Sequence, residues 1–348
     1  MSRCKLEEFI SYEQPAKYIV DSDQYDDSYE IPVLTAGKSF ILGYTDEKNN
    51  IFDNLPVIIF DDFTTSVQFV DFPFKVKSSA MKLLKNTEQA DIKYCYYLLK
   101  FLQHTPENHK RQWLSATSQK TVELPAIEEQ KNIVKKLDKI LEVIDNQNKQ
   151  MELLDEAIKA RFVEMFGNPV SNSKDLPIQK MSNVAPICQY DGSFEERVWL
   201  LNLDMVESQT GRIINYNIVG KDEIGGSVCT FDENNILYSK LRPYLNKVVI
   251  PNDKGYATSE LVPLRPDNKI INRIYLAYLL RSNEFVEMIK EKVAGAKMPR
   301  VSMSDFREFN VPIPPLELQN QFASFVQEID KSRLLSNHSL SLIKSITF

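Results

Sequence analysis

The chain has 348 residues, of which 43% are hydrophobic, and this is enough apolar material for two ordinary domain cores. Four cysteines lack the C-x-x-C spacing of metal and redox sites, and no apolar run approaches the roughly 20 residues that span a bilayer. The N-terminus lacks a signal-peptide pattern, so these features predict a soluble protein of the reducing cytoplasm, without a membrane partner. The net charge of −6 argues weakly against nucleic-acid binding, but residues 234–300 hold twelve bases and six acids.

The first 124 residues read as a mixed domain in which strands are followed by one helix. A Tyr- and Asp-rich stretch at residues 18–30 favours a solvated loop. Runs of β-branched and aromatic residues follow, and the spacing of apolar residues then changes to the helical period. The predicted strands are residues 31–37, 39–45, 55–70 and 72–84, and the predicted helix is residues 92–103.

The strongest pattern lies at residues 124–167, which are predicted to form one long helix. Its apolar residues follow a seven-residue repeat, typical of a helix that packs along a partner helix. Pro125 marks the helix start and Gly167 its end. At about 1.5 Å per residue, roughly 38 helical residues extend about 57 Å. The repeat comprises Ile133, Leu137, Ile140, Ile144, Met151, Leu154, Ile158 and Met165, interrupted by the polar Gln147 and Arg161.

The beginning of this helix recurs after Val311, in the segment PIPPLELQNQFASFVQEIDKS. A repeat of nearly half the chain indicates two copies of one large unit, not a solenoid of short repeats. We expect the two helices to pack antiparallel through their matching apolar rows. The matched pairs are Pro125 with Pro314, Glu128 with Glu317, Gln130 with Gln319, Ile133 with Phe322, Leu137 with Val326, and Ile140 with Ile329.

Residues 168–312 repeat the order of the first domain. The segment IIFDDFTTSVQFV can be superposed on ILYSKLRPYLNKVV, so that Phe60 matches Tyr238 and Val70 matches Val248. The apolar frame is kept, whereas the intervening polar residues differ in charge. This contrast favours one scaffold that presents two different binding surfaces, and ordinary divergence of surface residues is the alternative.

These segments resemble the specificity subunit of Type I restriction-modification systems. The resemblance rests on PPLELQNQF and LPAIEEQKNIVKKLDKI before the helices, RFVEMFGNP, LYSKLRPYLNKV and GAKMPRVS. It implies an α/β (α+β) fold in which two similar target-recognition domains are joined by two long antiparallel coiled-coil helices in a pseudo-twofold repeat. The implied parts are target-recognition domains at 1–124 and 168–312, a central helix at 125–167, and a distal helix at 313–348, which is shorter than the central one.

The same resemblance implies a DNA-binding protein that reads a bipartite target in double-stranded DNA. It would direct two methyltransferase (M) subunits and, in a full complex, restriction (R) subunits, without catalysis of its own. S-adenosylmethionine, ATP and Mg²⁺ would then belong to the partner subunits, and this chain would hold no cofactor. The alternative is a non-catalytic coiled-coil assembly adaptor, or an unpaired specificity protein that reads little DNA.

Basic and hydroxyl side chains are the candidates for DNA contact, and those of the second domain fall in predicted loops between apolar strands. Lysine and arginine neutralise phosphates, and an arginine can pair with both acceptors of a guanine. Asp61 or Asp62 could accept from a cytosine amino group, but both are equally suited to capping turns. A solvated basic face is the alternative for the second-domain cluster. The candidates are Lys240, Arg242, Lys247, Lys297 and Arg300 in the second domain and Asp62, Thr64, Thr65, Lys75, Lys77, Arg111, Ser118 and Lys120 in the first.

The sequence contains none of the local motifs that the relevant catalysis needs. It has no G-x-G-x-x-G cofactor loop, no tetrapeptide similar to the NPPY of adenine methyltransferases, and no phosphate-binding P-loop. His104 and His109 are five residues apart, which does not put them on one helical face, and His338 is isolated. We therefore expect neither a catalytic site nor a metal site.

Overall fold

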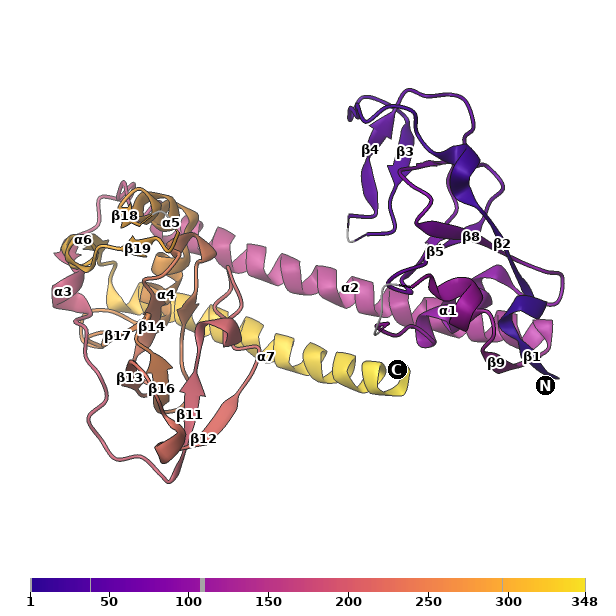
Figure 1. The fold of residues 1–348 in the computed structure, drawn as a ribbon. Helices are drawn as coiled ribbons and strands as arrows, with labels where there is room; N and C mark the ends of the chain where they lie inside the picture. Colours follow the sequence, from indigo (N-terminus) through magenta and orange to yellow (C-terminus); the bar gives the residue numbers. More distant parts are fainter. Residues whose placement is uncertain (1, 38, 107–109, 296, 348) are drawn as a thin grey trace. The chain divides into compact units, whose positions relative to one another are not determined.

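The computed structural model describes residues 2–37, 39–106, 110–295 and 297–347. It divides the chain into two compact units (Figure 1). Unit 1 comprises Met1–Asn146 and Leu340–Phe348, and unit 2 comprises Gln147–Ser339. Within the described residues, no helix is both long and apolar enough to cross a membrane.

Unit 1 is built on a four-stranded antiparallel sheet in the order β2-β8-β5-β6. A second sheet has the order β4-β3-β7, and β1 pairs with β9. The first helix packs with Leu6, Phe60 and Trp113 in an apolar core beside the larger sheet. The elements are β1 (Ser2–Lys5), β2 (Ile10–Glu13), β3 (Ile31–Leu34), β4 (Ile41–Thr45), β5 (Val57–Asp61), β6 (Val67–Val70), β7 (Lys75–Val76), β8 (Met81–Asn86), α1 (Ile92–Phe101), a π-helical turn (Trp113–Thr117) and β9 (Thr121–Leu124).

Unit 2 contains the sheets β12-β11-β16-β13 and β15-β14-β17 and the pairs β10-β20 and β18-β19. Two helices, α4 and α5, pack with the second sheet in its largest apolar core. The elements are β10 (Ile178–Lys180), α3 (Met181–Val184), β11 (Arg197–Leu201), β12 (Asn217–Gly220), β13 (Val228–Phe231), β14 (Ile236–Ser239), β15 (Val248–Val249), β16 (Gly255–Thr258), β17 (Leu261–Leu264), α4 (Arg273–Arg281), α5 (Asn283–Lys290), β18 (Val293–Ala294), β19 (Arg300–Val301), α6 (Met303–Glu308) and β20 (Asn310–Pro312).

The two units repeat one arrangement, as the sequence predicts. Strand β5 lies between β8 and β6 in unit 1, and β14 lies between β17 and β15 in unit 2. Helix α1 follows β8, and helix α4 follows β17. Each helix begins with an N-cap side chain, Asp91 for α1 and Asn272 for α4, which accepts hydrogen bonds from the first helical N–H groups. The limits between the two units, at residues 146/147 and 339/340, lie within the two long helices. The predicted domain boundaries at residues 124 and 312 therefore stay predictions.

The strand registers correct one detail of the predicted superposition. Phe60 pairs with Val67 across β5 and β6, whereas its counterpart Tyr238 pairs with Val248 across β14 and β15. Val248 therefore corresponds to Val67, not to Val70. The cause is a difference in loop length, because residues 62–65 join the strands in unit 1 and residues 240–246 join them in unit 2.

The two long helices are α2 (Ile127–Phe166) and α7 (Leu316–Thr347), and Figure 1 shows each as one unbroken helix. In unit 2, the rings of Phe162 and Phe322 are 5.5 Å apart, and Asp155 forms an ion pair with Arg333. Since residue number falls along α2 as it rises along α7, the helices run antiparallel within this unit. One apolar core of unit 2 contains Ile158, Phe162, Phe166, Phe322, Val326 and Ile329, with Leu154 and Met165 packed against it.

The expected pairing of the two apolar rows is wrong. Ile133 packs on the core of unit 1, whereas Phe322 packs in the core of unit 2 against Phe162. The physical reason is the repeat itself, because equivalent residues perform the same task in their own copy. Ile133 thus attaches α2 to the core of unit 1, whereas Phe322, Val326 and Ile329 lie in the core of unit 2. The remaining predicted packing residues, Leu137, Ile140, Ile144 and Met151, are half-buried.

A buried glutamine joins each recognition domain to its long helix. The Gln130 side chain accepts from the N–H of Asp91 at 2.8 Å, and its amide donates to the carbonyls of Gln89 and Pro125 at 3.1 and 2.8 Å. Gln319 repeats these bonds with the Asn272 N–H at 2.7 Å and with the carbonyls of Ile270 and Pro314 at 3.2 and 2.8 Å. Both glutamines are fully buried. The sequence match of Gln130 with Gln319 therefore marks a pair of structural clamps.

Replacing Gln130 by Met keeps the side-chain volume but leaves a buried N–H and two carbonyls without their partner. We expect the free energy of unfolding of unit 1 to fall by about 1–3 kcal/mol. Gln319→Met should have the same effect on unit 2. Urea unfolding followed by hydrogen exchange of each unit measures both. The exposed Gln150 on α2 is the control, and Gln150→Met should change stability by less than about 0.5 kcal/mol. Equal stability of all three variants would show that the clamps contribute nothing.

Candidate nucleic-acid interface

The loop between β14 and β15, residues 240–246, has an unusual backbone. Arg242 and Asn246 have positive φ angles of 48° and 50°, on either side of a 3₁₀ turn formed by Pro243–Leu245. A left-handed conformation is uncommon for residues other than glycine and costs about 1–3 kcal/mol for each. The surrounding contacts must therefore hold this loop in its shape.

A second segment, residues 297–301, lies beside this loop. The N–H of Arg242 donates to the carbonyl of Pro299 at 2.8 Å, and the N–H of Val301 donates to that of Lys240 at 2.9 Å. Leu241 and Arg300 also form an isolated β-bridge. The segments LYSKLRPYLNKV and GAKMPRVS are thus neighbours in space. We call residues 240–246 and 297–301 the basic loop pair.

The candidate lysine and arginine side chains of unit 2 differ in how free they are to contact DNA. Arg300 donates three hydrogen bonds of 2.7–3.1 Å to the Glu260 carboxylate, and these bonds hold the pKa of Glu260 below its usual value. Its charge is therefore partly neutralised. Lys247 is half-buried and donates to the carbonyl of Leu203 at 2.7 Å, while burial lowers its pKa. Arg242 and Lys297 are exposed, and Lys240 is half-buried.

In unit 1 the two aspartates of the equivalent turn are both buried but have different partners. Asp62 is 1% exposed, accepts from the Trp113 N–H at 2.8 Å, and lies 3.3 Å from the ammonium of Lys82, which is equally buried. Asp61 accepts from the Phe63 N–H at 2.9 Å and from the Thr64 hydroxyl at 2.7 Å. Turn capping therefore holds for Asp61, whereas the Asp62 carboxylate is buried against Trp113 and Lys82. Asp62 is not available to a cytosine amino group.

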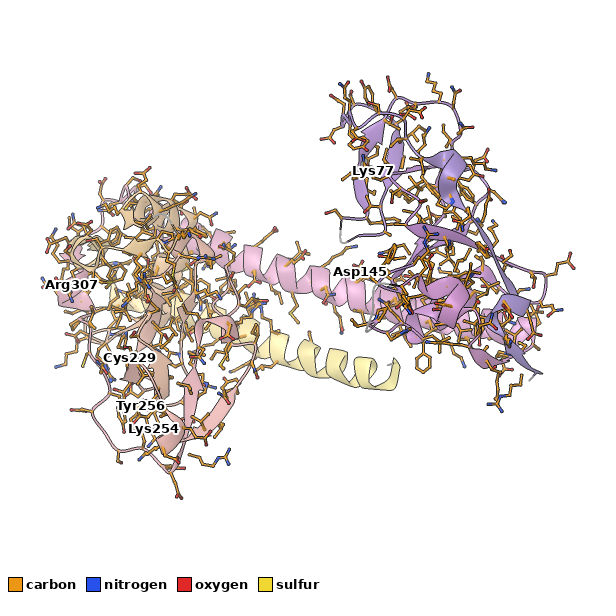
Figure 2. All side chains as sticks on the ribbon, viewed as in Figure 1. Lys77, Asp145, Cys229, Lys254, Tyr256 and Arg307 are labelled. Atoms are coloured by element: carbon orange, nitrogen blue, oxygen red, sulfur yellow. The ribbon has the colours of Figure 1, made fainter. Side chains whose placement is uncertain are left out.

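Five further candidates of unit 1 also stabilise the fold. Thr65 is buried and donates to the carbonyl of His104, Lys75 is buried in an ion pair with Glu47, and Ser118 is buried. Lys120 donates to the carbonyl of Leu102, and Lys77 forms an ion pair with Asp23. Lys77 is labelled in Figure 2. The sequence places these residues near loops, but it does not show which side chains turn inward.

Thr64 and Arg111 remain exposed in unit 1. Arg111 corresponds to Arg300, because the hydrogen bond from the Gln112 N–H to the Asp62 carbonyl repeats that from Val301 to Lys240. By the same comparison Ala80 stands where unit 2 has Glu260. Arg111 therefore lacks the carboxylate that binds Arg300, and no other acid in the described part of the chain pairs with it.

Sequence reasoning missed several residues of these surfaces. Lys110 and Tyr244 are exposed beside the two candidate arginines, Arg111 and Arg242. The one sequence signal for Lys110 and Tyr244 is that each lies close to a candidate arginine in the chain. Lys82, the buried partner of Asp62, lies in a strand whose alternation gives no sign of an inward charge.

The predicted absence of a metal site can be examined only in part. His109 lies outside the described residues, as does the side chain of His338. In the remainder of the chain, no three His, Cys, Asp or Glu side chains are grouped as metal ligands would be.

The family model of the Type I restriction modification DNA specificity domain matches residues 3–156 and 204–345. The chain belongs to this family. The two matched ranges also agree with the internal repeat, and the family predicted from the sequence is confirmed.

Two curated proteins of Escherichia coli are similar to part of the chain. The Type I restriction enzyme EcoR124I/EcoR124II specificity subunit is 46% identical over 146 residues, which cover 40% of this chain and 36% of the relative. The Type I restriction enzyme EcoDI specificity subunit is 27% identical over 146 residues, 41% of this chain and 32% of the relative. The chain thus spans about a third of the length of these relatives in each alignment.

A solved structure extends the likeness to the whole fold. The crystal structure of a Type-I restriction-modification system S subunit from M. genitalium superposes with a TM-score of 0.60 and 13% identity, over 99% of this chain and 93% of that chain. At this identity the likeness shows a shared fold.

Replacing Asp62 by Ala tests its structural role. The change leaves the Lys82 ammonium buried without a partner, so we expect the free energy of unfolding of unit 1 to fall by roughly 3–5 kcal/mol. Thermal and urea unfolding measure this loss. Asp71 is exposed, and Asp71→Ala should be nearly neutral. A fully stable Asp62→Ala protein with altered DNA preference would instead return Asp62 to base reading.

Proposed function

We propose that this chain is the DNA-reading specificity subunit of a Type I restriction-modification complex, and that each recognition domain reads one half of a bipartite target. One observation carries the proposal. Equivalent strands of the two units bear different loops, a short turn at residues 62–65 and the longer basic loop at residues 240–246. Two copies of one scaffold with different exposed loops suit two different short sequences.

The chemistry of the exposed side chains supports direct reading. Arg242 carries a planar guanidinium that can donate two hydrogen bonds to a guanine, whereas the ammonium of Lys297 suits a phosphate. In unit 1 the exposed candidates are Thr64 and Arg111, the latter equivalent to Arg300 but without its carboxylate partner. An assembly adaptor would have no need for a strained and exposed basic loop, so this loop favours DNA reading over the adaptor function.

We also propose that catalysis belongs to partner subunits. Methyltransferase subunits would supply S-adenosylmethionine, and restriction subunits would use ATP and Mg²⁺. Membership of the specificity-domain family supports this division of tasks. The number of partner subunits, two methyltransferases in our proposal, can be measured by the mass of the purified complex.

Methylation sequencing of cellular DNA tests the proposal at single bases. Cells that carry the chain with its methyltransferase should show one bipartite methylated motif, which is lost without the chain. Arg242→Ala should cost about 1–3 kcal/mol of discrimination and relax one position in one half only. Absence of any motif that depends on the chain would contradict the proposed function.

Lys297→Ala tests the assignment of a phosphate contact. It should weaken binding to all DNA sequences alike and lower the slope of log K against log salt by about one. The exposed Lys269 of unit 2 lies outside the basic loop pair, and Lys269→Ala should leave affinity and slope unchanged. Fluorescence titrations at several salt concentrations measure both variants. If Lys297→Ala altered the preferred bases but not the slope, the phosphate assignment would fail.

A further inference from the structure

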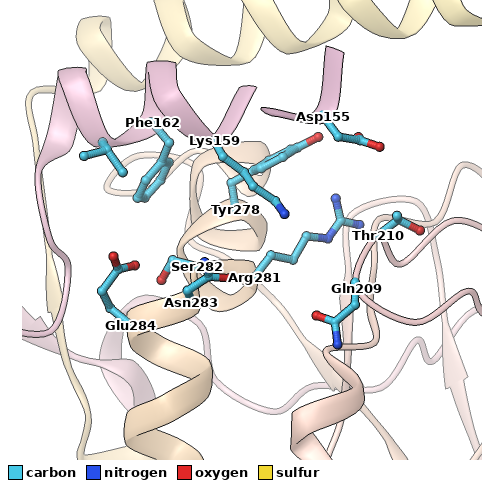
Figure 3. Close-up of a pocket in the computed structure, with 11 residues that line it drawn as sticks. Asp155, Lys159, Phe162, Gln209, Thr210, Tyr278, Arg281, Ser282, Asn283 and Glu284 are labelled. Atoms are coloured by element: carbon cyan, nitrogen blue, oxygen red, sulfur yellow. The ribbon is translucent and has the colours of Figure 1, made fainter. Parts of the chain in front are cut away.

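The end of helix α4 is bonded to the exit of the 240–246 loop. The Nε and Nη2 atoms of Arg281 donate to the carbonyl of Val248 at 3.1 and 2.5 Å, and its own carbonyl accepts from the Asn246 amide at 2.9 Å. The guanidinium lies over the ring of Tyr278, 5.1 Å from the centroid (Figure 3). Arg281 therefore fixes the left-handed residue Asn246 and the first residue of β15 together.

A turn at residues 207–212 contacts the same loop from another direction. The Gln209 N–H donates to the carbonyl of Leu245 and its side-chain amide to that of Tyr244, both at 3.0 Å. Gly211 has a φ of 67°, and a Cβ there would lie 1.8 Å from the Val248 carbonyl, so only glycine permits this approach. Gln209 thus binds two consecutive carbonyls of the loop, those of Tyr244 and Leu245.

The 207–212 turn is itself held by the long helices within unit 2. Arg212 donates to Asp155 of α2 at 2.5 Å, and the other oxygen of Asp155 accepts from Arg333 of α7. Figure 3 shows Asp155, Gln209 and Arg281 around one cavity, of about 140 Å³, between α2 and α4. The 207–212 turn is therefore ion-paired to α2 through Asp155, which also binds α7.

Unit 1 provides an internal comparison. Counted from the N-caps Asp91 and Asn272, Lys100 takes the place of Arg281. Lys100 is exposed, and its ammonium lies over the ring of Tyr96 at 5.4 Å, not on the turn. The short turn 62–65 is held by other groups, because Asp61 bonds within the turn and the Thr65 hydroxyl donates to the carbonyl of His104, beyond the end of α1. The arginine anchor accompanies the longer loop.

We propose that Arg281 and Gln209 are positioning residues for DNA reading. They touch no base, and they hold residues 240–246 in the conformation that presents Arg242 to one half of the target. The inference rests on the proposed function, because it assigns a specificity role through the loop that would read DNA. A preformed loop loses less conformational entropy on binding and presents its arginine in one geometry, which favours discrimination between bases.

Two mild substitutions test the inference without removing a buried side chain. Arg281→Lys keeps the charge but loses the paired N–H donors. Gln209→Asn keeps an amide and tolerates the positive φ of this position, 69°, but is too short to reach the Tyr244 carbonyl. Lys100→Ala is the matched control at the equivalent position of unit 1.

The first readout is hydrogen exchange, which needs no DNA. We expect exchange of the amides of residues 240–248 to rise at least tenfold in Arg281→Lys and Gln209→Asn. Residues 61–66 should keep their rates in both variants, and all rates should be unchanged in Lys100→Ala. Unchanged exchange of residues 240–248 would overturn the anchoring role, whatever the chain does with DNA.

The second readout is methylation sequencing with the whole complex in cells. The variants should lose at least tenfold in discrimination at the positions that Arg242→Ala relaxes, while the other half of the motif keeps full discrimination. An unaltered motif, or an equal loss in both halves, would overturn the positioning role. If the unsubstituted chain directed no methylation, the proposed function would fall, and hydrogen exchange would still decide whether the loop is anchored.

Discussion

A single buried amide on each long helix determines how a recognition domain is attached. Gln130 and Gln319 each bind the N-cap N–H of the domain helix and a carbonyl at the start of their own helix. An amide with one acceptor and two donors satisfies three backbone groups that would otherwise be buried unpaired, which makes its replacement costly. Because both clamps use the same bonds, the two domains hold their helices in the same way.

This common attachment leaves the exposed loops free to differ. In unit 1 the turn after β5 is short, and a buried carboxylate and lysine, Asp62 and Lys82, support it from below. In unit 2 the loop after β14 is longer, and hydrogen bonds from Gln209 and Arg281 hold it in a left-handed conformation. The scaffold thus tolerates two loop designs without a change in its strand order or in its clamp.

The sequence was sufficient for the features that repeat. The offset between Gln130 and Gln319 predicted two copies and the starts of both long helices, and the opposite charge around Arg242 indicated where the copies differ. Side-chain direction was not predictable in the same way. Asp62, Lys75 and Lys247 are charged residues that the sequence offered for DNA contact, yet each side chain binds a group that is distant in sequence. These partners are Lys82, Glu47 and the carbonyl of Leu203. The pairing of Ile133 with Phe322 failed because periodicity shows which face is apolar but not what covers it.

The central claim is that each copy reads its own half of the target through its own loop. Replacing residues 240–246 by the shorter sequence of residues 62–65 tests it most directly, because the substitution leaves the strands and both clamps intact. Methylation sequencing should then show a changed second half, with the first half and the spacing between halves unchanged. A change in the half read by residues 1–124, or a motif identical to that of the unsubstituted chain, would contradict the account.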